Sequence, residues 1–130
     1  MVLDTSAIIA VLLAEAGSER LIDRISTSAI VVVGAPTIME TAIVLSAKLQ
    51  RDARPVLNGF LRRAEAEVIL FSQEHYELAV EAFLRYGKGR HAAALNFGDC
   101  LTYAVARLSH LPLLCTGNDF AKTDLDTVAG

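Results

Sequence analysis

Four short apolar runs alternate with longer segments of helical spacing, and this alternation constrains the fold more than any other feature of the chain. The runs are Met1–Leu3, Ile30–Val33, Val68–Phe71 and Leu113–Cys115. Apolar strands separated by helices are typical of a parallel sheet with helices on both faces. Crossovers in such sheets are right-handed, so the carboxyl ends of the strands share one edge. Ligands of open α/β sheets bind outside that edge, which predicts where a site would lie.

Apolar spacing and helix-starting residues predict the helices between these runs. The β-branched run Ile30–Val33, ended by Gly34, is typical of a strand buried on both faces. Pro36 suits the first turn of a helix, and Ser72 can begin another. We expect helices over residues 7–14, from Ser18, over 36–49, over 54–66, from Ser72 and from Asn96 to Leu108.

Length and composition indicate a single compact domain spanning residues 1–130. The chain has a mass of 14.0 kDa and is 53% hydrophobic and 21% charged, with no linker or internal repeat. We find no signal peptide and no apolar run of the roughly 18 residues that a membrane span needs. We therefore expect a cytoplasmic protein without a membrane partner. Cys100 and Cys115 have no metal-ligand spacing, so we expect buried, reduced thiols.

The net charge of −3, from fifteen acidic and twelve basic residues, excludes a general basic coat for nucleic acid. Aromatic residues make up only 6% of the chain and tryptophan is absent, which argues against a protein that stacks many bases.

Four acidic residues lie in unusual sequence surroundings. Asp4 and Asp119 follow apolar strands, Asp99 opens an apolar helix, and Glu40 lies one turn into another. Asp4 and Asp99 could simply cap helices, the latter together with Asn96, and Asp119 could belong to a turn. Glu40 is harder to explain structurally, because a carboxylate in apolar surroundings costs several kcal/mol unless it is paired or neutralised.

These four carboxylates are expected to converge at the carboxyl edge of the sheet, where their mutual repulsion requires a cation. No Arg or Lys lies within three residues of Asp4, Glu40 or Asp99. Oxygen ligands with retained water are what Mg²⁺ or Mn²⁺ selects, and such an ion indicates phosphate chemistry. Without the four acids, eleven acidic residues face twelve basic ones, so the mild acidity does not count against an RNA partner.

The sequence resembles a known family over essentially its whole length, in motif order, spacing and size. The matching segments are VLDTSA from Val2, Glu40, NFGDCL from Asn96 and TGNDF from Thr116. They are similar to the four motif regions of PIN-domain ribonucleases, specifically the VapC toxins of bacterial toxin–antitoxin modules. No core motif residue is missing.

The resemblance implies a three-layer α/β/α PIN-like fold and an endoribonuclease that depends on Mg²⁺, with Mn²⁺ as a substitute. It implies an acidic pocket in which Asp4 and Asp99 hold the metal directly, while Glu40 and Asp119 hold it directly or through water. It also implies a homodimer, an RNA substrate such as tRNA, and a VapB-type antitoxin whose tail blocks the pocket. The supporting residues are expected to be Ser6, Asn96, Thr116 and Asp124.

Two groups of basic residues are candidates for holding RNA phosphates, which position a nucleic acid without reading its sequence. The first lies along residues 48–63 and includes Arg51 and Arg54. The second comprises Arg85, Lys88 and Arg90 around a loop that two glycines are expected to make mobile. Each group could also be an ordinary solvated surface.

Two other interpretations of the acidic residues remain open. In a phosphohydrolase of the haloacid-dehalogenase type Asp4 would be the nucleophile, but the second Asp that this chemistry uses is replaced by Ser6, and Lys122 is an imperfect candidate for its lysine. The chain could also be a non-catalytic α/β interaction module. Nucleotide-binding glycine loops and a serine-hydrolase elbow are absent from the sequence.

Overall fold

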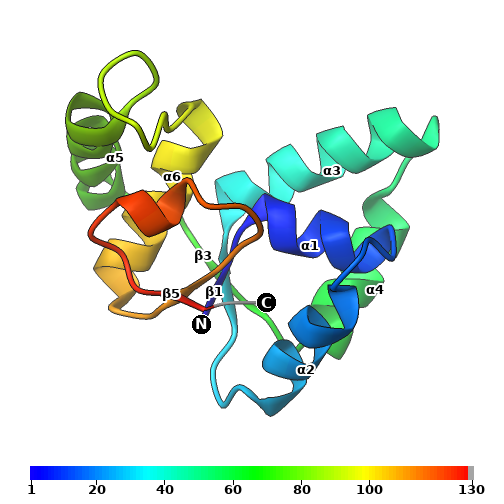
Figure 1. Ribbon diagram of the computed structural model, residues 1–130. Helices are drawn as coiled ribbons and strands as arrows, with labels where there is room; N and C mark the ends of the chain where they lie inside the picture. The colour runs from blue at the N-terminus through cyan, green and yellow to red at the C-terminus, as the bar shows by residue number, and fades with distance from the viewer. Residues whose placement is uncertain (129–130) are drawn as a thin grey trace.

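A five-stranded sheet organises residues 1–128, which are the residues that the computed structural model describes (Figure 1). Its strand order is β3-β2-β1-β4-β5, and every neighbouring pair is parallel. At its centre, Val2 pairs with Val32 on one side and with Leu113 on the other. The strands are β1 (Val2–Leu3), β2 (Val32–Gly34), β3 (Glu67–Ile69), β4 (Leu113–Leu114) and β5 (Thr127–Val128).

Six α-helices and one short 3₁₀ helix connect the strands within the described residues. They are α1 (Thr5–Leu12), α2 (Ser18–Thr27), α3 (Ala35–Leu49), α4 (Arg54–Arg63), α5 (Gln73–Tyr86), α6 (Phe97–Ser109) and η1 (Phe120–Lys122). None of these helices is both long and apolar enough to cross a lipid bilayer.

The helices cover both faces of the sheet because neighbouring residues of each strand point to opposite sides. Val2 and Leu113 contribute to one buried cluster, together with residues of α5 and α6. Leu3 and Leu114 contribute to the other, together with residues of α1, α2 and α4. In Figure 1, α5 and α6 accordingly lie on one side of the sheet and α1, α2 and α4 on the other. The expected three-layer, parallel α/β fold is confirmed.

The outer strands depart from the expected pattern. The strand expected over Val68–Phe71 is observed at Glu67–Ile69, where β3 pairs only with β2 and forms the edge of the sheet. Val68 and Leu70 are therefore 46% and 77% exposed. The opposite edge, β5, was not expected, because a two-residue strand containing a threonine leaves no apolar run in the sequence.

Helix ends are set by local chemistry that the sequence indicates only in part. The helix expected over residues 54–66 ends at Arg63, because Glu65 has a left-handed backbone with φ 51°. Asp4 caps α1, so this helix begins at Thr5, before the expected Ala7.

Both cysteines are buried and unpaired, as expected. Gly130, the end of the expected domain, lies outside the described residues.

The glycine-containing loop between α5 and α6 is tied down rather than open. The Lys88 amide donates to the Leu95 carbonyl at 2.9 Å, and the Leu95 amide donates to the Tyr86 carbonyl at 3.0 Å. The Arg90 guanidinium lies over the Phe83 ring, 5.4 Å from its centroid. The sequence predicts a mobile loop because it does not reveal these contacts. They connect residues that are too far apart for a local pattern to indicate.

Gly34, at the end of β2, allows α6 to approach the sheet closely. A methyl group built on Gly34 would lie 2.8 Å from a methyl carbon of Val105, and its backbone needs no glycine, with φ −69°. We expect Gly34→Ala to destabilise the fold by about 1–3 kcal/mol, the usual cost of overpacking. Denaturant unfolding measures this cost.

A double-mutant cycle with Val105→Ala tests the cause. The double variant should be more stable than the sum of the two single effects predicts, because removal of the Val105 methyl groups makes room for the methyl group added by Gly34→Ala. Simple additivity would mean that the contact between β2 and α6 is not the constraint.

Candidate active site

Asp4 is fixed where β1 ends and α1 begins. Its amide donates to the Leu114 carbonyl at 3.0 Å, which ties it to β4. Its carboxylate oxygen Oδ2 accepts from the Ser6 amide at 3.1 Å and from the Ser6 hydroxyl at 2.6 Å. The side chain is buried, and the positive end of the helix dipole favours its charge. Asp4 is therefore a helix cap, and its second oxygen accepts no hydrogen bond from the described residues 1–128.

Ser6 links this cap to the loop after β4. Besides donating to Asp4, its hydroxyl accepts a hydrogen bond from the Thr116 amide at 3.0 Å. Ser6 and Thr116, both expected to support the site, thus connect the first helix with the loop that carries Asp119, the residue before η1.

Glu40 reaches the same region from α3. Its Oε1 accepts from the Thr5 hydroxyl at 2.7 Å. Its carboxyl group also lies against Gly98 in the first turn of α6, where an added methyl group would be only 2.8 Å from the carboxyl carbon. Gly98 is a site residue that the sequence interpretation missed. The signal was a glycine inside a predicted helix, where alanine would be more favourable.

Asp99 and Asn96 form a reciprocal cap at the start of α6. The Asn96 amide donates to Asp99 Oδ2 at 3.1 Å, and the Asp99 amide donates to Asn96 Oδ1 at 2.9 Å. The capping interpretation of Asn96 is confirmed. The same bonds hold the Asp99 carboxylate in one orientation at the amino end of α6.

The pKa of Asp99 indicates that the four acids share one electrostatic environment. Burial, followed by the charges of Asp4, Asp119 and Glu40, raises the pKa of Asp99 to about 6, against the effect of the hydrogen bond from the Asn96 amide. Burial, followed by the charges of Asp4, Asp99 and Asp119, raises the pKa of the Cys115 thiol to about 12. The four predicted carboxylates therefore lie within electrostatic reach of one another.

No basic side chain balances this charge within residues 1–128. The ion pairs recorded there involve only Asp52 and Asp124. No three carboxylate, imidazole or thiol groups of these residues lie close enough to enclose a metal ion by themselves. The donor set is thus all oxygen and loosely gathered, which fits a hydrated Mg²⁺-type ion held by one or two direct carboxylates.

Comparison with known proteins identifies the family. A model of the PIN domain matches residues 1–125. The chain belongs to the PIN-domain family. It is 46% identical over 127 residues to Ribonuclease VapC36 of Mycobacterium tuberculosis, covering 97% of this chain and 91% of that protein. It is also 37% identical over 128 residues to Ribonuclease VapC of Mycolicibacterium smegmatis, covering 98% and 99% of the two chains.

Solved structures share the fold of this PIN domain. The crystal structure of VapC20 from Mycobacterium tuberculosis, described as a Sarcin-Ricin loop cleaving toxin, matches with a TM-score of 0.80 at 20% identity, covering 99% of this chain and 98% of the other. A toxin–antitoxin complex from Klebsiella pneumoniae matches with a TM-score of 0.68 at 22% identity, covering 95% and 92%.

Asp124, expected to support the site, makes its recorded contacts elsewhere in this PIN domain. It accepts from the Tyr103 hydroxyl at 2.8 Å and lies 3.6 Å from the guanidinium groups of Arg85 and Arg107. It is not among the charges that act on Asp99. These contacts belong to an ion cluster along α6. The position of Asp124 in the sequence, close to Asp119, could not reveal this cluster.

The two basic groups differ in their relation to the carboxylates. Arg51 and Arg54 follow the carboxyl end of α3, about 15 Å along the helix from Glu40, and Arg54 pairs with Asp52 at 2.8 Å. Lys88 and Arg90 lie instead in the loop that leads directly into the amino end of α6.

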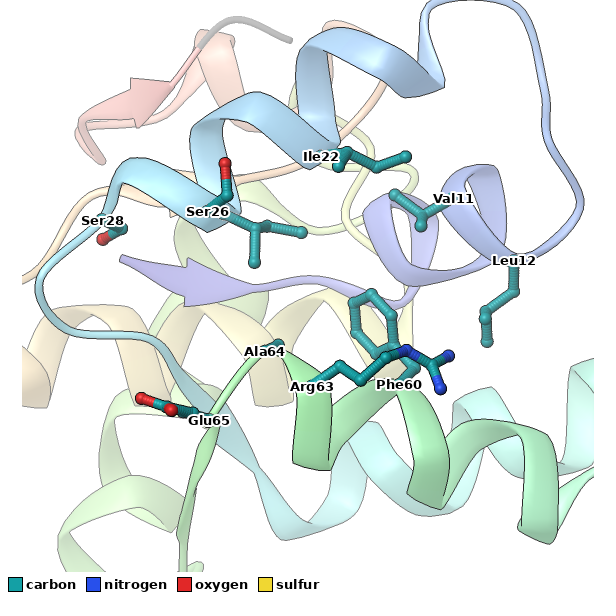
Figure 2. Close-up of a pocket in the computed structure, with 10 residues that line it drawn as sticks. Val11, Leu12, Ile22, Ser26, Ser28, Phe60, Arg63, Ala64 and Glu65 are labelled. Carbon is teal, nitrogen blue, oxygen red and sulfur yellow. The ribbon is translucent and has the colours of Figure 1, made fainter.

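A separate hollow lined by both apolar and polar side chains lies between α1, α2 and α4, with a volume of about 660 Å³ (Figure 2). In Figure 2, Phe60 and Arg63 of α4 lie opposite Val11 and Leu12 of α1. None of the four carboxylates lines this hollow. The hollow is therefore separate from the group of carboxylates.

The raised pKa of Asp99 predicts a pH-dependent cost to stability. Between pH 4 and 6 the folded state holds a proton that the unfolded chain has released, so the contribution of Asp99 falls as pH rises and is least favourable above pH 6. Without added metal, Asp99→Asn should be more stable than the native protein at pH 7.5 by about 1 kcal/mol, allowing for solvent screening. This difference should shrink at pH 4.

Thermal unfolding in a chelator at both pH values measures the effect. Glu81→Gln, which neutralises an exposed carboxylate of α5, serves as the control and should change stability little. An Asp99→Asn variant no more stable than the native protein at pH 7.5 would contradict the account of charge crowding.

Proposed function

We propose that this chain is a divalent-metal-dependent endoribonuclease, the toxin of a toxin–antitoxin module, which hydrolyses RNA phosphodiester bonds. The observation that carries the proposal is the group of four carboxylates that have no basic partner among residues 1–128. This group occurs in a PIN domain 46% identical to a curated ribonuclease.

Asp4 and Asp99 would hold the ion directly, and Glu40 and Asp119 would hold it directly or through water. Mg²⁺ is the proposed ion, with Mn²⁺ as a substitute. When bound, such an ion acidifies water and offsets the negative charge that develops on the phosphate during displacement.

The contribution of the chain is to hold these oxygens in place before RNA arrives. Ser6 occupies one oxygen of Asp4, the Asn96 amide occupies one oxygen of Asp99, and Thr5 holds one oxygen of Glu40. Each of these three carboxylates keeps a second oxygen that accepts no hydrogen bond within residues 1–128, in an orientation that its partner fixes. Such preorganisation reduces the rearrangement needed to bind a metal and a phosphate.

Lys88 and Arg90 are the proposed phosphate contacts, because their loop adjoins the amino end of α6. Phosphate contacts position RNA without reading its sequence. We assign no such role to Arg54, because Asp52 already binds its guanidinium. The substrate class proposed is structured cellular RNA, with tRNA as a candidate.

A VapB-type antitoxin and a second copy of the chain are the proposed protein partners, and the proposed compartment is the cytoplasm. The fold-level match to a toxin–antitoxin complex supports the antitoxin. A basic side chain from its tail could pair with the unbalanced carboxylates, since a guanidinium binds carboxylates strongly. Exposed apolar side chains, including Phe97 at 80% exposure, support a homodimer.

The haloacid-dehalogenase alternative receives no support from the site. That chemistry uses a second carboxyl group two residues after the nucleophile, whereas Ser6 occupies this position and donates its hydroxyl proton to Asp4 at 2.6 Å.

Cleavage of total cellular RNA tests the proposed function. The purified native protein should cut RNA with Mg²⁺ and stop in a chelator, and Asp4→Asn should lose at least about two orders of magnitude of the rate, since metal-ion stabilisation contributes several kcal/mol. Asp23→Asn, an exposed carboxylate of α2, should cleave like the native protein. Equal cleavage in the chelator and by Asp4→Asn would indicate a contaminating nuclease and refute the proposal.

The salt dependence of cleavage tests the RNA contacts. We expect the double variant Lys88→Ala/Arg90→Gln to raise the KM for RNA and to weaken its salt dependence, by about 0.7 in the log–log slope for each lost contact with a single strand. The matched double variant Arg51→Ala/Arg54→Ala removes two positive charges from the distant group and should change KM much less. Equal changes in KM and salt dependence for the two double variants would contradict the proposed RNA contacts at Lys88 and Arg90.

A further inference from the structure

A series of threonine hydroxyls connects the buried core to Glu40. Thr41, the next residue of α3, is completely buried. Its Oγ1 lies 3.1 Å from Thr5 Oγ1, and the Thr5 hydroxyl lies 2.7 Å from Glu40 Oε1. The carboxylate is thus connected to a buried hydroxyl through one intermediate side chain.

The direction of these hydrogen bonds follows from the groups involved. An ionised carboxylate only accepts, so the single hydroxyl proton of Thr5 is donated to Glu40. The Thr5 oxygen is then free to accept, and the Thr41 hydroxyl is its donor. Thr41 has only one hydroxyl proton, which it shares between the Thr5 oxygen at 3.1 Å and the Thr37 carbonyl, one helical turn earlier, at 2.7 Å. This shared bond fixes the Thr41 side chain with its hydroxyl beside Thr5.

Glu40 has little room to move between this hydroxyl series and α6. On its other side the carboxyl group lies against Gly98, close enough that even an added methyl group would collide with it. The hydrogen bond from Thr5 therefore selects one orientation within a narrow space. If Thr5 turns away, nothing else recorded among residues 1–128 donates a hydrogen bond to the carboxylate.

We propose that Thr41 is a positioning residue for Glu40, which acts by orienting the Thr5 hydroxyl that holds the carboxylate at the metal site. This inference rests on the proposed function, because it assigns Glu40 to metal binding. Thr41 does not touch metal or RNA, and its effect passes entirely through Thr5.

Two other buried threonines provide a matched control. The hydroxyls of Thr37 and Thr102 lie 3.3 Å apart and contact each other rather than Thr5 or Glu40. Both residues are buried in the same part of the core as Thr41. Thr37→Val therefore removes a buried hydroxyl nearby and leaves the Thr41–Thr5–Glu40 series complete.

The test compares Thr41→Val, Thr41→Ser and Thr37→Val by the thermal shift that Mn²⁺ alone produces, followed by RNA cleavage. Thr41→Val keeps the shape of the side chain but removes the donor, and we expect the Mn²⁺ concentration for half of the full shift to rise about tenfold, in the range usual for residues that orient metal ligands. Thr41→Ser should restore the native midpoint, and Thr37→Val should leave it unchanged. The Mn²⁺ concentration needed for half-maximal RNA cleavage should follow the same order among the variants.

The outcomes separate this inference from the proposed function. A native Mn²⁺ midpoint in Thr41→Val, while Asp4→Asn still abolishes metal-dependent cleavage, would overturn the inference alone. An equal rise in Thr37→Val would also overturn it, because general core damage would then be the cause. If the native protein showed neither an Mn²⁺ shift nor metal-dependent cleavage, both proposals would fail. Thr41→Ala supplies the same comparison if Thr41→Val does not fold.

Discussion

The mutual repulsion among four carboxylates around Asp99 is the constraint on which the proposed site depends. Burial of Asp99, followed by the charges of the other three residues, raises its pKa to about 6, so the fold maintains an unfavourable arrangement. It does so with short, local devices: the amino ends of α1 and α6, the hydroxyls of Ser6 and Thr5, and a glycine that lets α6 approach Glu40. The repulsion that lowers the stability of the fold is thus the same repulsion that a bound cation would relieve.

Capping and metal binding are compatible roles for the same side chains. Asp4 and Asp99 each use one carboxylate oxygen to cap a helix, and this bond fixes the orientation of the other oxygen. In the proposed metal site, a cap would therefore serve by preventing rotation of the carboxylate ligand. The same reasoning explains why sequence alone could not choose between a structural and a functional interpretation of these residues.

Much of the fold could be predicted because it depends on local patterns. Short apolar runs located the central strands, and the acids that interrupt or follow apolar sequence identified the carboxylates whose role in the site stays a prediction. Long-range effects escaped prediction. The exposure of Leu70 depends on β3 lying at a sheet edge, the contacts of Asp124 depend on the packing of α6, and the role of Gly98 depends on the approach of α3.

The central claim is that this unbalanced edge is a divalent metal site. Crystals of the protein grown with Mn²⁺ and measured at the manganese absorption edge would test it most directly. The account predicts an anomalous peak in contact with the carboxylates of Asp4 and Asp99, completed by water and by Glu40 or Asp119. Ordered, accessible carboxylates without a peak between them, or a peak only at another surface, would contradict it.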